Sequence, residues 1–149
     1  MFKRLKGFTL LEMLVVMAIV ASASLVLLPL SFTQIRSGKA TSFAQSLASL
    51  IFSVQQNAYA RVNDKTYGVS FSTNTYTIFT GDTLATATNK EVITLDSGLT
   101  FSTINFPSDL IFTKGTFRPN SSGSVIVSDG TNRYQISVSS EGFISYVRL

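Results

Sequence analysis

The sequence lacks two residue types that carry much of protein chemistry. None of its 149 residues is cysteine, so the chain can form neither a disulfide nor a thiolate metal site. None is histidine, which removes the commonest general base and the commonest metal ligand. The length leaves room for one modest domain, and that domain must be stabilised by core packing or by assembly with neighbours.

Clustered acidic side chains are also missing. Beyond residue 32 no two carboxylates lie within four positions of each other, so the chain has no calcium-binding loop of the Asp-x-Asp-x-Asp type. The abundant serines and threonines occur without histidine and without a Gly-x-Ser-x-Gly turn. The sequence therefore predicts no catalytic site, no metal site and no cofactor.

The excess of positive charge is confined to the first residues. The formal net charge is +4, from 12 basic and eight acidic side chains. Three of the basic residues are Lys3, Arg4 and Lys6, and without them nine basic side chains face eight acidic ones. The composition therefore does not support a strongly basic surface for nucleic acid.

A long apolar run follows this basic start. Residues 13–32 contain no charged side chain, and a helix of about 20 mostly apolar residues can cross the core of a bilayer. The basic flank predicts a cytoplasmic N-terminus, with the rest of the chain on the far side. Glu12 lies at the edge of this run. A carboxylate in lipid costs about 2.5–3.5 kcal/mol at a helix centre and less near an end, so Glu12 needs a partner.

The stretch from Lys6 to Glu12 reads Lys-Gly-Phe-Thr-Leu-Leu-Glu and, with the apolar run behind it, resembles the processing signal of type IV prepilins and pseudopilins. The resemblance implies that a prepilin peptidase removes a leader, residues 1–7, by cutting after Gly7, and then N-methylates Phe8. It also implies that Glu12 neutralises the terminal amine of a neighbouring subunit. An ammonium and a carboxylate attract strongly in a low dielectric, so this amine is a suitable partner.

Two other interpretations of the N-terminus remain open. Ala21-Ser22-Ala23 could end a secretory signal that is cut after Ala23, although apolar residues continue beyond that point and Glu12 would interrupt the signal. A simple signal anchor explains the length of the apolar run but gives Glu12 no role.

The helix is expected to continue beyond the apolar run. We expect residues 8–32 to form its membrane-spanning and filament-core half, with a kink near Pro29 because proline lacks a backbone donor. Residues 33–62 are predicted to form an amphipathic distal half. Its apolar side chains recur at helical spacing: Phe43, Leu47, Leu50, Ile51, Val54 and Ala58.

Residues 63–149 show the alternation typical of half-buried strands, with turn-forming residues between them. The strands are expected at residues 67–71, 76–79, 91–95, 99–104, 110–113, 124–128, 133–139 and 143–149, with a loop at 83–89 and a closing three-stranded meander. We therefore predict an α+β, pilin-like fold, in which a long N-terminal helix packs by its distal half on a small antiparallel β-sheet domain.

The C-terminal part carries a second resemblance. Residues 117–148 resemble the C-terminal half of minor pseudopilins of the GspH/FimT type, although Tyr146-Val147-Arg148 departs from the arginine-rich ending of the DNA-binding members. Basic residues in this part are candidates for a patch that contacts DNA: Lys114, Arg118, Arg133 and Arg148. Solvated surface charge is the preferred interpretation, because four scattered cations give little affinity.

The two resemblances imply a structural subunit, not an enzyme. It would be a single-pass inner-membrane protein with a cytoplasmic N-terminus and an outer globular domain. An inner-membrane assembly platform would then extract it and stack it with other pilin or pseudopilin subunits into a type IV pilus, a type II secretion pseudopilus or a competence filament. The alternative is a minor pilin that binds DNA or a surface during DNA uptake or adhesion.

Overall fold

The computed structural model describes residues 9–149, except for the side chains of residues 23–37. The chain divides into two compact units, Met1–Arg36 and Ser37–Leu149, and each is described by itself. Helix α1 (Leu10–Tyr59) supplies the described part of the first unit and continues into the second. Every residue between its ends is helical, including Pro29 and Gly38.

The part of α1 in the second unit buries one side in the core. Its buried apolar residues recur every three or four positions: Ala40, Ala44, Leu47, Ile51, Val54 and Ala58. The predicted stripe is confirmed at Leu47, Ile51, Val54 and Ala58, whereas Phe43 and Leu50 lie at its margin and are partly buried. The buried stripe begins earlier than predicted, because it also includes Ala40 and Ala44.

Helix α1 ends at Tyr59, three residues before the end expected from the sequence. Arg61 adopts a left-handed conformation with φ 52° and ψ 39°, which stops the helical hydrogen-bond pattern. The N–H of Gly115 donates to the carbonyl of Ala58 over 2.9 Å and so satisfies one of the last helical acceptors. A single 3-10 turn, η1 (Val62–Asp64), then leads into the strands.

The predicted antiparallel β domain is confirmed, and it consists of two sheets instead of one. Sheet A has the order β3 (Asn89–Thr94), β2 (Thr75–Thr80), β1 (Tyr67–Phe71) and β5 (Leu110–Phe112). Sheet B has the order β4 (Thr100–Asn105), β6 (Gly123–Ser128), β7 (Arg133–Val138) and β8 (Ile144–Arg148). The predicted C-terminal meander is β6–β7–β8, and its central strand buries Tyr134, Ile136 and Val138 as expected.

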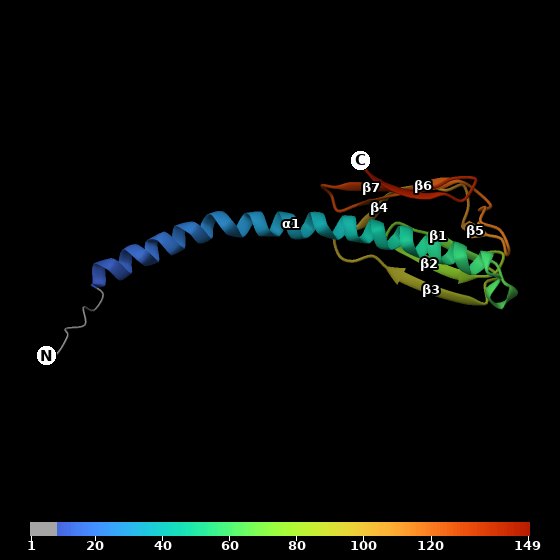
Figure 1. Ribbon diagram of the computed structural model, residues 1–149, viewed down its shortest axis with the longest axis horizontal. Helices are drawn as coiled ribbons and strands as arrows, with labels where there is room; N and C mark the ends of the chain where they lie inside the picture. The colour runs from blue at the N-terminus through green and yellow to red at the C-terminus, as the bar shows by residue number, and fades with distance from the viewer. Residues whose placement is uncertain (1–8) are drawn as a thin grey trace. The chain divides into compact units, whose positions relative to one another are not determined.

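The two sheets and the distal half of α1 share one hydrophobic core (Figure 1). Phe43 of α1 lies 6.2 Å from Tyr76 in sheet A and 6.1 Å from Phe101 in sheet B, measured between ring centroids. The backbone joins the sheets at the same place, because the N–H of Phe101 donates to the carbonyl of Thr73 over 2.9 Å. The turn between β1 and β2 is therefore fixed to sheet B.

Candidate functional site

The start of α1 lies within the predicted processing signal. Gly7 and Phe8 are outside the described residues, and the description begins at Thr9. The hydroxyl of Thr9 accepts a hydrogen bond from the backbone N–H of Glu12 over 3.3 Å, so Thr9 is the N-cap of the helix. Glu12 then occupies the first turn, where a negative charge is favoured by the helix dipole.

Sequence reasoning missed this cap, although its signal was present. Thr9-x-x-Glu12 matches the spacing of a capping box, in which a threonine at the N-cap is followed three residues later by a glutamate. Thr9 and Glu12 therefore also define where the helix begins. The expected cleavage site after Gly7 lies just ahead of the first helical residue, Leu10.

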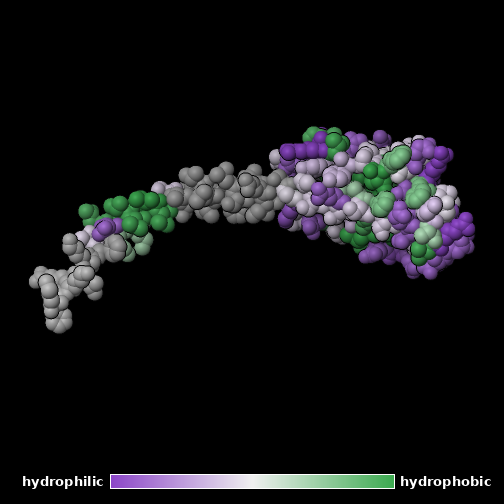
Figure 2. Space-filling model, viewed as in Figure 1, coloured by the Kyte–Doolittle hydropathy of each residue, from purple (hydrophilic) through white to green (hydrophobic). Residues whose placement is uncertain are grey.

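Residues 10–22 of α1 expose their side chains, most of which are apolar (Figure 2). Glu12 is the one ionisable residue in this segment. In the part of the chain that the structure describes, no helix is both long enough and apolar enough to cross a membrane. The expected membrane-spanning half, residues 8–32, reaches beyond the described side chains and stays a prediction, as does the kink at Pro29.

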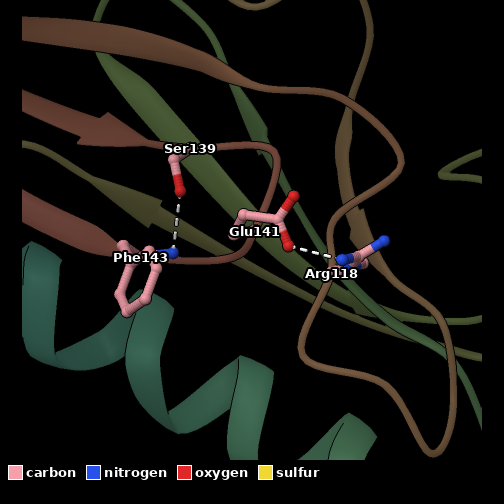
Figure 3. Close-up of polar contacts among 4 residues, drawn as sticks. All are labelled: Arg118, Ser139, Glu141 and Phe143. Carbon is pink, nitrogen blue, oxygen red and sulfur yellow. Dashed lines mark hydrogen bonds and ion pairs between the residues drawn. The ribbon is translucent and has the colours of Figure 1, made fainter.

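Two of the four candidate DNA-contacting cations form ion pairs. Lys114 lies 2.8 Å from the carboxylate of Asp64, and its hydrogen bond and charge hold the pKa of Asp64 below the usual value. Arg118 lies 2.6 Å from the carboxylate of Glu141 in the turn between β7 and β8 (Figure 3). Each cation is thus neutralised locally, while the pairs themselves are exposed and contribute little to stability.

The other two cations lie at the opposite end of β7. Arg133 begins this strand, and Arg148 pairs with Tyr134 across to β8. The guanidinium of Arg148 donates to the side-chain oxygen of Asn132 over 2.8 Å. The six residues of β7 separate this end from the Arg118–Glu141 pair by about 20 Å. The structure therefore does not gather the four cations into one patch.

The turn beside Arg133 is held by a carboxylate. Asp129 accepts hydrogen bonds from the backbone N–H groups of Thr131 and Asn132, over 2.9 and 2.6 Å, and from the Asn132 side chain. Burial alone would raise the pKa of Asp129, but these hydrogen bonds outweigh it and hold the pKa below the usual value. Asp129 therefore serves the β6–β7 turn.

A buried amide that the sequence did not reveal joins α1 to two distant segments. Gln55 is 3% exposed, and its side-chain nitrogen donates to the carbonyls of Phe117 and Gly142 over 2.7 and 2.8 Å. The turn that contains Gly142 is itself closed by Ser139, whose hydroxyl accepts from the N–H of Phe143 over 3.0 Å (Figure 3). A glutamine within a mostly polar helix segment gives no signal of burial, so sequence reasoning could not identify this contact.

The described residues contain no group of three acidic side chains positioned to hold a metal ion. The polar side chains described above act on structure: they cap a helix, close turns or pair with each other. The N-terminus is therefore the region whose residues point to a specific chemical modification.

Comparison with known proteins identifies this region. Residues 2–28 match the model of the prokaryotic N-terminal methylation motif. No curated protein and no solved structure shows significant similarity to the chain. The matched segment contains Gly7 and Phe8, and Glu12 is its one acidic residue. The chain therefore carries the N-terminal signal of a type IV pilin-like precursor.

Proposed function

We propose that the protein is a structural subunit, a minor pilin or pseudopilin, of a type IV pilus, a type II secretion pseudopilus or a competence filament. A prepilin peptidase cuts after Gly7 and N-methylates Phe8. The subunit waits in the inner membrane, anchored by the first half of α1, with its β domain on the outer side. An assembly platform then extracts it and adds it to other subunits by stacking of the N-terminal helices.

The match to the methylation motif carries this proposal. The structure supports the proposal because an exposed apolar helix segment precedes a domain that has its own core. Glu12 is the one charge on the described part of that helix up to residue 22, so it is the group available to neutralise a terminal amine from a neighbour. Pairing of both charges is favourable in a low dielectric, whereas either charge alone is costly.

DNA binding receives no comparable support. Lys114 and Arg118 are paired with Asp64 and Glu141, and Arg133 and Arg148 lie at the other end of sheet B. Affinity for DNA grows with the number of phosphates contacted together, so separated and neutralised cations contribute little.

The proposal is tested first by the mass of the mature protein. Co-expressed with a prepilin peptidase, the chain should lose residues 1–7 and gain one methyl group on Phe8. Gly7→Val, which places a branched side chain beside the scissile bond, should stay uncut and serves as the control. A mature chain that begins at Ser24 would instead establish an ordinary secretory signal.

The second measurement is the location of the mature protein. In cells that contain the assembly machinery, the processed subunit should appear in the filament fraction released by shearing, while uncut Gly7→Val should remain in the membrane. Processed protein that never leaves the membrane would contradict the filament role.

A further inference from the structure

The two sheets have four edges, of which two, β3 and β5, are protected against pairing with another strand over their whole length. On β3, Lys90 and Glu91 place charges along the edge. On β5, only three residues long, the open side is occupied by a bridge between Phe112 and Pro119 and by Asn120, whose amide N–H donates to the carbonyl of Ile111 over 2.8 Å. Charges, short strands and covered edges are the usual means by which proteins prevent edge-to-edge association.

The β4 edge is protected only at its beginning. Its register with β6 is irregular between Phe101 and Thr103, and such a bulge twists an edge away from partners. Beyond the bulge, residues 103–105 pair regularly with β6 and carry no charge. Ile104, in the middle of this segment, is 38% exposed.

The β8 edge has none of these protections over most of its length. The N–H of Leu149 donates to the carbonyl of Arg133 over 2.9 Å, which fixes which residues of β8 bond to β7. By the alternation of an antiparallel ladder, the backbone groups of Ile144, Tyr146 and Arg148 point to the open side. Among the described residues these groups have no backbone partner. Val147 is 55% exposed, and Arg148 is the one charge on the strand.

The directions of the strands determine which partner suits β8. Sheet B has four strands, and each neighbouring pair is antiparallel, so its two edge strands, β4 and β8, run in opposite directions. A second copy placed beside the first in the same orientation brings its β4 antiparallel to β8. The antiparallel order of the strands in sheet B then continues from one copy into the next.

The other partners are less suitable. Pairing of β8 with β8 of a second copy requires a two-fold axis and closes a dimer, which cannot propagate along a filament. The β3 edge of a second copy carries the charges of Lys90 and Glu91, and charged side chains on an edge strand disfavour pairing with another strand. The β5 edge is covered.

We infer that β8 of one subunit pairs with the 103–105 segment of β4 in the next copy of this chain, so that sheet B continues from subunit to subunit. The inference rests on the proposed function in the form in which copies of this chain follow one another in the filament, because a polar filament requires contacts between two different surfaces of neighbouring subunits. It adds to that function a contact between β domains, separate from the stacking of the N-terminal helices.

The absence of cysteine makes a clean test available in the full-length protein. The variant Val147→Cys/Thr103→Cys places one thiol on each proposed edge and on the same face of sheet B, and the variant Val147→Cys/Asn105→Cys covers a shift of register by two residues. After mild oxidation of sheared filaments, one of them should form a ladder of cross-linked subunits. The control is Val147→Cys/Val92→Cys, because Val92 is 65% exposed on the β3 edge. It should cross-link at least tenfold less.

Each other result overturns the inference in a recognisable way. Equal cross-linking in the β3 control would mean that contact is unspecific, and dimers from Val147→Cys alone would establish two-fold β8 pairing. Filaments that contain both thiols but do not cross-link would refute the β8–β4 contact and leave the filament role intact. Processed protein that never enters filaments would refute the filament role, and the head-to-tail contact with it.

Discussion

The two ends of helix α1 face opposite environments. Between Leu10 and Val20 the large apolar side chains are 49–82% exposed, whereas from Ala40 to Ala58 an apolar stripe is almost completely buried by sheets A and B. Exposed apolar surface of this extent marks a site for lipid or for other subunits, because each buried methylene is worth about 0.8 kcal/mol. The first part of the helix therefore depends on other molecules, and the second part belongs to a domain with its own core.

Glu12→Gln should produce the largest effect of the substitutions considered, and this effect should be confined to assembly into filaments. The variant keeps the shape of the side chain. In the proposed filament it leaves the terminal ammonium of a neighbour unpaired, which costs about 3–5 kcal/mol in a low dielectric. Incorporation into sheared filaments should fall on the order of 100-fold or more, while cleavage after Gly7 and the fold of the β domain stay unchanged. Normal incorporation of the cleaved variant would remove the charge-pairing role of Glu12.

Gly142→Ala should produce the largest effect on folding of the second unit. Gly142 has a φ of +87°, and a Cβ there would collide with the carbonyl of Phe117 and the amide of Gln55. Gly130, with a φ of +90° and open space around it, is the matched control. In the chain that begins at Ser31, urea unfolding should show a loss of about 2–4 kcal/mol for Gly142→Ala and about 1–2 kcal/mol for Gly130→Ala. Equal losses would mean that the tight contact is unimportant.

Gln55→Met should lower the unfolding free energy of the same chain by about 2 kcal/mol. The substitution keeps the length of the side chain but leaves the carbonyls of Phe117 and Gly142 without their donor in a buried place. Gln56→Met, one residue along the helix and partly exposed, should change this free energy by less than about 0.5 kcal/mol. A similar effect of both variants would show that Gln55 is replaceable by any side chain of its size.

Asp129→Asn should give the smallest effect, and one that depends on pH. The pKa of Asp129 is lowered in the folded protein, so its carboxylate stabilises the fold above the unfolded pKa of about 3.9, and this stabilisation is lost as the pH falls through the folded pKa. The difference in unfolding free energy between the parent and the variant should be below about 1 kcal/mol at pH 6, because solvent screens a partly exposed group. It should shrink toward pH 3. A difference that is constant with pH would contradict this role.

The features that could be predicted from the sequence are those with a local signal. The apolar stripe around Leu47 and Ile51 follows from helical spacing. Strand β7 follows from the alternation of Tyr134, Ile136 and Val138 with polar residues, between two polar turns. The processing signal around Gly7 depends on a few residues in fixed order, and the methylation motif confirms it.

The features that escaped prediction depend on contacts between distant positions. Residues 95–99 connect β3 of sheet A to β4 of sheet B, and this connection divides the strands into two sheets. In the sequence β5 lies between β4 and β6 of sheet B, yet it pairs in sheet A. No residue pattern within β4 or β5 specifies which sheet the strand joins. In the same way, the burial of Gln55 is decided by Phe117 and Gly142, far along the chain.

The contact between Gln55 and Gly142 also has a consequence for the growing chain. Its partners are separated by 87 positions along the chain. While the protein is being synthesised, α1 and most of the strands therefore exist before this hydrogen bond can form. A product that ends before Gly142 would retain the helix and its apolar start but would leave the Gln55 amide without one acceptor. Such a fragment should be degraded more readily than a chain that contains Gly142.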